Sequence, residues 1–301
     1  MLSQVNETIH SGILLYQRCL ISGISEDAQH TSRDVTNYVI VPLAMLVAFL
    51  SLLSNGLVLT AVIRARSLQN PPLLLLCSLS ITDLLWALFS IVRGTGRYTT
   101  ESLCLEKSKE LAWFSSLCFT ATAGSLAIIS RDRYLAVSKP LLYRNNVKRS
   151  RVFKHALAVW LSSLMSSGFV YAKEHSLISG IVPLLANRFM YVFSLIIIIY
   201  SYIGILIANL RHNRVMHQHG QRGRLHAIIK REKKLANTVG LILIVPLLTF
   251  VPAICFPPFL LISGLAESVE NLAAWIPFYS FLISLNGFLN PLLNYGRNGR
   301  S

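Results

Sequence analysis

The fold of this chain is decided by the stretch LAWFSSLCFTATAGSLAIISRDRY, residues 111–134. Its first 20 residues contain no Asp, Glu, Lys or Arg. A run of about 20 apolar residues is long enough to cross a bilayer as a helix. The run is followed by Arg131 and then by Asp132-Arg133-Tyr134, so three charged residues stand where such a helix would leave the hydrocarbon. The stretch therefore predicts a membrane-spanning helix with a charged last turn.

Six further runs of the chain have the same apolar character. Because hydrocarbon offers no partner to backbone N–H and C=O groups, each run is expected to close its hydrogen bonds internally, as a helix. One run carries a single acid, Asp83, and another is only 17 residues long. The seven predicted spans are residues 38–63, 71–92, 111–130, 156–172, 190–210, 235–265 and 272–295. The sequence therefore predicts an all-α membrane protein, a bundle of seven transmembrane helices.

The composition argues against a soluble helical bundle. Hydrophobic residues make up 53% of the chain, and the mean hydropathy is +0.54. Ordinary soluble domains are less apolar than this and do not contain repeated charge-free runs of spanning length. A soluble fold is therefore not expected.

The net charge of +15 is distributed unevenly along the chain. Eight of the 28 Lys and Arg residues fall in segments or helix halves predicted on one side, which leaves 20 for the other side. The Lys-rich and Arg-rich side holds only two acids, Asp132 and Glu232, whereas ten of the 13 acids lie opposite. Basic loops mark the cytoplasmic side of a membrane protein. The amino terminus is therefore expected outside the cell, and nucleic acid is not expected as a partner.

These assignments divide the chain into an extracellular tail (residues 1–37), a transmembrane domain (38–296) and a short cytoplasmic tail (297–301). Asn6 begins the only glycosylation triplet in the outer tail, which predicts a glycoprotein.

Cys19 and Cys104 are the two cysteines in predicted outer segments. In an oxidising compartment they could form a disulfide or remain two free thiols, and both alternatives stay open.

Short motifs accompany the spans, each at a particular end of its own helix. They are NGLV (55–58) in the first span, LSITD (79–83) in the second, SRDRYLAV (130–137) in the third, Trp160 in the fourth, EKK (232–234) and TFVP (249–252) in the sixth, and NGFLNP (286–291) in the seventh. In this order the motifs resemble those of the rhodopsin-like G-protein-coupled receptors, and the resemblance covers nearly the whole bundle. It implies a multi-pass plasma-membrane receptor that binds an extracellular ligand, activates a heterotrimeric G protein and has no enzymatic activity.

Asp83 is a candidate functional residue on physical grounds alone. An ionisable side chain in a bilayer is expected to face the bundle interior and to have a partner there. Asn286 and Asn290 lie one helical turn apart, so their side chains can share one face and converge on Asp83. The family resemblance implies that these three residues, with Thr122, bind an allosteric Na⁺. A buried hydrogen-bond network with water is the alternative, and no obligatory cofactor is expected.

Arg133 is the second candidate, because a guanidinium stays charged and needs a partner at the membrane boundary. Asp132 is adjacent, and Glu232, at the start of the sixth predicted helix just before its apolar span, is a distant candidate. The resemblance implies that such ion pairs hold the bundle inactive and that their opening admits a G protein; a plain interfacial anchor is the alternative. The switch residues implied by the resemblance are Asp132, Arg133, Tyr134, Tyr200, Glu232, Phe250, Pro252, Asn290 and Pro291.

The ligand is constrained only by exclusion. Amine receptors carry Asp eighteen residues before the Arg, where this chain has Ser115, and opsins carry Lys six residues before the last Asn, where it has Ser284. Neither a biogenic amine nor retinal is therefore expected. Arg188 could bind an anionic group of the ligand or extend to the lipid headgroups. The residues expected to line the ligand site are Ser115, Phe119, Arg188, Phe250, Trp275, Ser280 and Ser284.

The chain departs from the family pattern at several positions. Phe250 stands where family members usually carry Trp, and Asn294 stands where they carry Tyr, with Tyr295 next. The third span lacks the usual preceding cysteine, since that place is Ser108, and the fifth span has Val192 where many relatives place Pro. The last two features resemble the melanocortin and lipid-receptor branches.

The alternative function is a transporter or channel of seven-helix architecture. Such a protein needs a continuous polar path or internal inverted repeats. The predicted spans contain one acid and no internal repeat, so the receptor interpretation is favoured.

Overall fold

The computed structural model describes residues 34–64, 71–99, 109–139, 142–143, 148–178, 182–219 and 276–298. Within these ranges all regular secondary structure is helical. The elements are the π-helix η1 (Thr36–Ile40) and the helices α3 (Val41–Arg64), α4 (Pro71–Thr99), α5 (Lys109–Ser138), α7 (Arg149–Glu174), α8 (Val182–His219) and α11 (Ile276–Asn298). They correspond to six of the seven predicted spans; the other, 235–265, lies outside the described residues.

The helices are longer than most of the apolar runs from which they were predicted. The clearest case is α7, which has 26 residues although its predicted span has 17. The additional turns at its start carry the exposed side chains of Arg149, Arg151 and Lys154. Long basic side chains can keep their charge in the headgroup region while the helix continues. Hydropathy therefore identifies the part of each helix that lies in hydrocarbon and not its full length.

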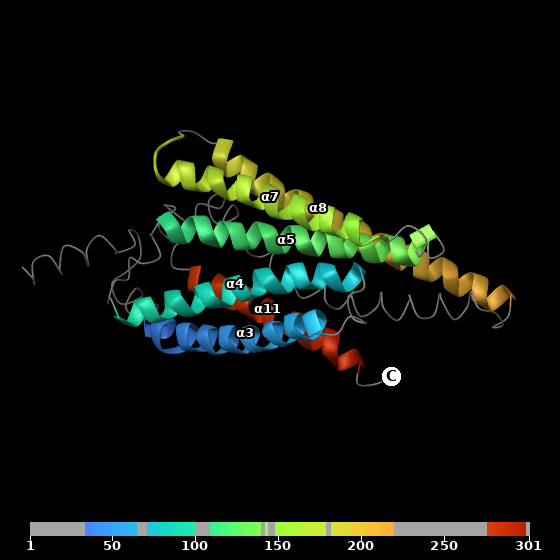
Figure 1. The fold of residues 1–301 in the computed structure, drawn as a ribbon, viewed down its shortest axis with the longest axis horizontal. Coiled ribbons are helices and arrows are strands. Elements are labelled where there is room, and N and C mark those ends of the chain that lie inside the picture. Colours follow the sequence, from blue (N-terminus) through green and yellow to red (C-terminus); the bar gives the residue numbers. More distant parts are fainter. Residues whose placement is uncertain are drawn as a thin grey trace, which may run out of the picture.

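Helix α5 is the centre of the bundle. Figure 1 shows α7 and α8 on one side of it and α3, α4 and α11 on the other. In the most apolar window of Trp113–Ser138, 72% of the residues are buried, compared with 28% for Thr36–Arg64 and for Leu185–Arg211. The helix that carries Asp132-Arg133-Tyr134 in its last turns is therefore the most enclosed of these helices.

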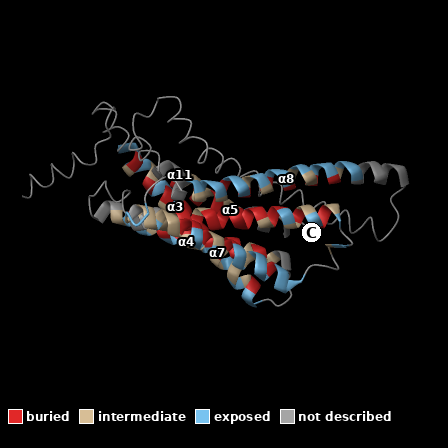
Figure 2. Ribbon diagram, turned by 90° about the horizontal axis from the view of Figure 1, so that it is seen from above, coloured by how far each residue is buried: buried red, intermediate tan, exposed pale blue. Residues whose placement is uncertain are grey.

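Burial in this bundle is the reverse of that in a soluble protein. Four of the described helical segments are long and apolar enough to cross a membrane. Large apolar side chains are exposed along α3, α7 and α8, as expected for surfaces that face lipid. Figure 2 shows exposed residues along α7 and α8 and buried ones along α5. Polar side chains are buried between the helices, where neighbouring helices can satisfy them. Buried members of this polar set include Asn55, Asp83, Arg133, Asn286 and Asn290.

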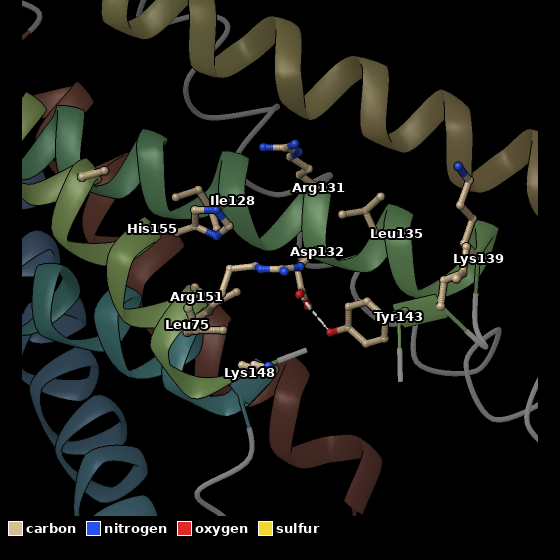
Figure 3. A pocket seen from close by; sticks show the side chains of 13 residues that line it. Leu75, Ile128, Arg131, Asp132, Leu135, Lys139, Tyr143, Lys148, Arg151 and His155 are labelled. Carbon is tan, nitrogen blue, oxygen red and sulfur yellow. Dashed lines mark hydrogen bonds between the residues drawn. The ribbon is translucent and has the colours of Figure 1, made fainter. Parts of the chain in front are cut away.

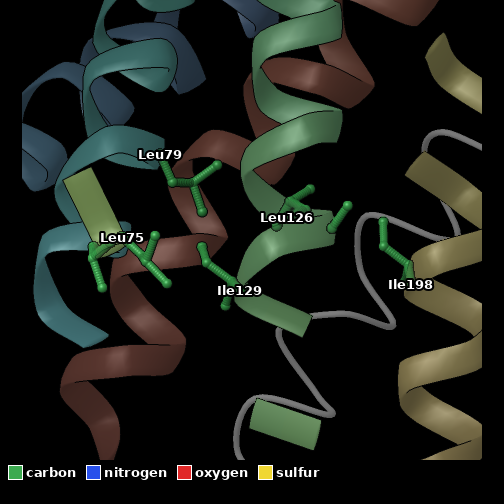
Figure 4. Close-up of a cluster of buried hydrophobic side chains, with 7 residues drawn as sticks. Leu75, Leu79, Leu126, Ile129 and Ile198 are labelled. Carbon is green, nitrogen blue, oxygen red and sulfur yellow. The ribbon is translucent and has the colours of Figure 1, made fainter. Parts of the chain in front are cut away.

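Two of the apolar clusters that hold the helices together around α5 lie at different heights along it. One joins α4, α5, α7 and α8 (Figure 4) and consists of Leu75, Leu79, Leu126, Ala127, Ile129, Val152 and Ile198. The other, nearer the opposite end of α5, consists of Trp86, Phe89, Cys118 and Ile283. Helix association in lipid depends on close van der Waals packing. Gly124 allows such packing between α5 and α7, because a Cβ there would lie 2.9 Å from Val159 Cγ1.

Candidate functional site

Arg133 is buried at the end of α5, with 7% of its surface exposed. Its Nη2 atom lies 2.5 Å from Asp132 Oδ2, in an ion pair between adjacent residues. A buried guanidinium without a carboxylate would be costly, because its charge has lost water. The geometry therefore places Arg133 and Asp132 together, as the sequence predicted.

Tyr143 completes this cluster, and sequence analysis gave it no role. Its hydroxyl donates to the Asp132 carboxylate, with oxygen distances of 2.8 Å and 2.9 Å, and accepts from Arg133 Nη2 at 3.5 Å. The backbone explains its position, since the Tyr143 N–H donates to the Lys139 carbonyl at 2.9 Å. That bond turns the chain back beside α5.

Tyr134 faces a different helix from that of its two charged neighbours. Its ring packs edge to face against Tyr200 of α8, with ring centroids 5.7 Å apart. A Cβ added at Gly204, one turn further along α8, would overlap the Tyr134 ring. Glycine at this position therefore lets the ring lie against the α8 backbone. The structure brings Tyr134 and Tyr200 together, and it adds Gly204 as a residue that the sequence did not single out.

Asp83 is buried near the middle of the bundle and contacts α11. Asn290 Nδ2 donates to Asp83 Oδ2 at 3.1 Å. Asn286 is fully buried, and neither its Oδ1 nor its Nδ2 has a hydrogen-bond partner among the described residues. Thr122 of α5 is also buried. Buried amide groups are rarely left without partners, so the Asn286 amide beside this polar cluster has capacity to bind a small cation or water.

Pro291 lies inside α11 and leaves one backbone carbonyl without its helical donor. In an α-helix the N–H of residue 291 would bond to the C=O of residue 287, and proline has no N–H. Asn55 of α3 supplies a replacement, because its Nδ2 donates to the Gly287 carbonyl at 3.0 Å. A Cβ at Gly287 would lie 2.9 Å from Ser51 Oγ. Asn55 and Gly287 therefore join α3 closely to the broken turn of α11.

The other end of the bundle has an aromatic wall. Trp86 of α4 packs against Phe89 and Phe119, with ring centroids 5.4 Å and 6.2 Å apart. Phe119 also contacts Tyr191 of α8 at 5.6 Å. The indole N–H of Trp86 donates to Ser284 Oγ at 3.2 Å, which accounts for the polar atom of this buried ring.

The predicted ligand residues divide between this wall and the bundle surface. Ser280 and Ser284 are buried on α11, and Ser284 donates to the Ser280 carbonyl at 2.9 Å. Ser115 and Phe119 are partly buried on α5. Arg188 is exposed on α8, whereas its neighbour Asn187 faces α5 and donates to Ser116 Oγ at 2.6 Å. Sequence analysis missed Asn187 because only helix rotation decides which of two adjacent residues faces inward.

Several predicted residues lie outside the described parts of the chain. They are Asn6, Cys19, Cys104, Glu232, Phe250, Pro252 and Trp275. Among the residues that are described, no group of three or more His, Cys, Asp or Glu side chains could hold a metal ion. The candidate sodium site depends instead on one carboxylate and on amide and hydroxyl groups.

Comparison with known proteins places this geometry in a family. The model of the 7 transmembrane receptor (rhodopsin family) matches residues 54–294. Cannabinoid receptor 2 of Mus musculus is 28% identical over 279 residues, covering 85% of this chain and 77% of that protein. Cannabinoid receptor 1 of Xenopus laevis is 24% identical over 285 residues, covering 85% of this chain and 59% of that protein. The human cannabinoid receptor 2 is 26% identical over 280 residues, covering 85% and 74%.

The matched range contains Asp132 and Arg133 of α5, Asp83 of α4 and Pro291 of α11. It agrees with the helical bundle, the apolar outer surfaces and the resemblance of the motifs. The chain belongs to the rhodopsin family of seven-transmembrane receptors, and it is a multi-pass receptor of the plasma membrane.

Proposed function

We propose that this receptor binds an extracellular ligand in the outer half of the bundle and activates a heterotrimeric G protein at the inner face. The observation that carries the proposal is the buried Arg133, whose guanidinium is held by Asp132 and Tyr143. A charge so enclosed can be exposed only if the cluster opens. Opening offers a permanently cationic group to a partner at the end of the bundle.

The proposed orientation rests on charge. The end of α5 that carries Arg133 adjoins the basic segments that contain 20 of the 28 Lys and Arg residues. Basic residues concentrate on the cytoplasmic side, so this end faces the G protein, and residues 1–37 face outward with Asn6 and Cys19. Trp86, Phe119 and Ser284 then lie toward the extracellular side, where a ligand can enter.

We expect a ligand with a largely apolar body. The rings of Trp86, Phe119 and Tyr191 pack against one another, and the indole N–H of Trp86 already has a partner. Phe119 is the partly buried ring of this wall, and an apolar group that lay against it would remove apolar area from water. The relatives named above are called cannabinoid receptors, so cannabinoid-like molecules are the first ligands to test. An anionic group on the ligand would find Arg188 at the rim.

A sodium ion bound at Asp83 would favour the closed bundle. Asp83 would supply the charge, and Asn286, Asn290 and Thr122 would supply neutral oxygens. The proposal is supported by the fully buried Asn286, whose amide atoms have no partners among the described residues. Hard cations such as Na⁺ select oxygen ligands of this kind.

The test is nucleotide exchange with purified receptor in lipid nanodiscs. We expect ligand-dependent GTP binding by at least one heterotrimer in a panel of α-subunits. Phe119→Ala should weaken ligand binding, while Phe153→Ala, an exposed ring on the lipid face of α7, serves as the matched control. Ligand-dependent ion flux without exchange on any heterotrimer would contradict the proposal and favour a channel or transporter.

A further inference from the structure

A cavity of about 560 Å³ lies at the inner end of the bundle, between α5, α7 and the segment 142–143. Leu75, Ile128 and Val152 form its apolar floor. Its polar lining is mostly basic, and Figure 3 shows these side chains around Asp132 and Tyr143. The basic residues that line it are Arg131, Lys139, Lys148, Arg151 and His155. The cavity therefore combines an apolar base with a cationic rim.

The positive charge of this cavity is not neutralised within the described parts of the chain. Arg131, Lys139, Lys148 and Arg151 are all exposed and form no ion pair with any described residue. Asp132 is the one acid in the lining, and its carboxylate is already bound to Arg133 and Tyr143. An anion that entered the cavity would meet four uncompensated cations.

The apolar lining distinguishes between kinds of anion. Leu135 and Leu142 line the cavity with 39% and 57% of their surfaces exposed. A free phosphate would leave these side chains in contact with water. A lipid would cover them with its glycerol and first acyl carbons, at a gain proportional to the apolar area removed from water. The combination of basic and apolar lining residues therefore favours a membrane lipid over a soluble anion.

We propose that this cavity binds the headgroup of an anionic phospholipid of the inner leaflet, and that headgroups with several phosphates bind most tightly. The assignment rests on the proposed orientation, in which this end of α5 faces the cytoplasm. Basic pockets between transmembrane helices on that side are suited to phosphorylated headgroups. Arginine adds bidentate hydrogen bonds to phosphate that lysine cannot form. Asp132 and Tyr143 line the same cavity, so a bound headgroup adjoins the Arg133 cluster.

Native mass spectrometry of the full-length receptor in detergent tests the proposal without a G protein. The probes are a short-chain phosphatidylinositol bisphosphate, a short-chain phosphatidylcholine and free inositol trisphosphate. The cavity variant is Lys148→Gln/Arg151→Gln. The matched control is Arg149→Gln/Lys154→Gln, which removes the same charge from the same helix at exposed positions that do not line the cavity.

We expect the wild type and the control to retain the bisphosphate lipid in preference to the other two probes. The cavity variant should bind it about tenfold to thirtyfold more weakly, the loss expected for two basic residues near anionic lipid. If that variant does not fold, Arg131→Gln/Lys139→Gln removes two charges of the same cavity, one from α5 and one from the residue that follows it.

Three results would overturn the proposal. Equal loss of lipid in cavity and control variants would indicate a diffuse basic surface, suited to an acidic protein segment. Equal retention of inositol trisphosphate and the lipid would indicate a soluble-anion site. Failure of the wild type to discriminate the bisphosphate from phosphatidylcholine would exclude a headgroup site. Nucleotide exchange, measured separately in phosphatidylcholine nanodiscs, tests the receptor function independently of these outcomes.

Discussion

The hydroxyl of Tyr143 donates to both carboxylate oxygens of Asp132, at 2.8 Å and 2.9 Å. The same carboxylate holds Arg133. Tyr143 lies ten residues beyond Arg133 and outside α5, so the bond ties the segment after the helix to its charged end. Among the described residues the restraint on Arg133 is therefore a three-residue cluster. The sequence predicted Asp132 as the adjacent partner and did not predict Tyr143; the second predicted candidate, Glu232, lies outside the described residues.

Replacing Tyr143 with Phe should raise basal nucleotide exchange. The ring is kept and only the hydroxyl is lost, so Asp132 loses one of its two partners. A hydrogen bond to a charged group is worth about 1.5–3 kcal/mol when enclosed, and this partly exposed one should contribute about 1 kcal/mol, or roughly fivefold in the active population. Exchange is measured without ligand. Tyr171→Phe, at the opposite end of the bundle, is the control, and equal effects of both variants would contradict the cluster.

The bond from Asn55 to the Gly287 carbonyl should stabilise α11 only because Pro291 is present. Asn55→Ala leaves a buried carbonyl without a donor, at a cost of about 1–3 kcal/mol, and should lower the thermal midpoint of the purified receptor. In a Pro291→Ala background residue 291 regains its N–H and can satisfy the same carbonyl. Asn55→Ala should then cost distinctly less. Equal losses in both backgrounds would show that Asn55 stabilises the bundle in another way.

Gly204 should be sensitive to a single methyl group because of Tyr134. Gly204→Ala places a Cβ in the space of the Tyr134 ring, and overpacking of this kind costs about 1–3 kcal/mol. The thermal midpoint should fall in the wild-type background and change little in a Tyr134→Ala background, where the ring is absent. Gly168→Ala is the control, since no atom lies within 4 Å of its added Cβ. Additive losses would refute the contact.

Sodium should stabilise the receptor through Asp83. An ion that binds only the folded, closed bundle raises the thermal midpoint by mass action. The midpoint should therefore be higher in sodium chloride than in an equal concentration of choline chloride. Asp83→Asn should abolish the difference, whereas the same substitution at Asp132 should preserve it. A sodium effect that persists in Asp83→Asn would contradict a sodium site at Asp83. The buried amides would then have water as their partner instead of sodium.

The helices could be predicted from the sequence because, in lipid, a spanning segment must satisfy its own backbone hydrogen bonds. Each apolar run had to be long enough to span and had to close its own backbone bonds. The contact between Asp83 and Asn290 followed from the same reasoning, because a buried acid needs a partner and the NGFLNP motif offers one a turn from Asn286. These inferences use only residue type and spacing.

The remaining contacts depend on how the helices are rotated and how closely they approach, which spacing does not determine. Asn187 faces α5 and its neighbour Arg188 is exposed, although either order is compatible with the sequence. Gly204 matters only because Tyr134 of another helix lies on it. The hydrogen bond from Asn55 to the Gly287 carbonyl depends on α3 and α11 lying side by side, which the sequence does not specify. Such pairings join residues far apart in the chain, and packing selects them.

Basal nucleotide exchange by the purified Asp132→Asn receptor tests the central claim most directly. The substitution removes the charge that holds Arg133 and leaves the size of the side chain nearly unchanged. The variant, folded and reconstituted in nanodiscs, should catalyse GTP binding by at least one heterotrimer without ligand, and faster than the wild type does. If it promotes exchange on no heterotrimer of the full panel, the Arg133 cluster is not a switch for G-protein activation.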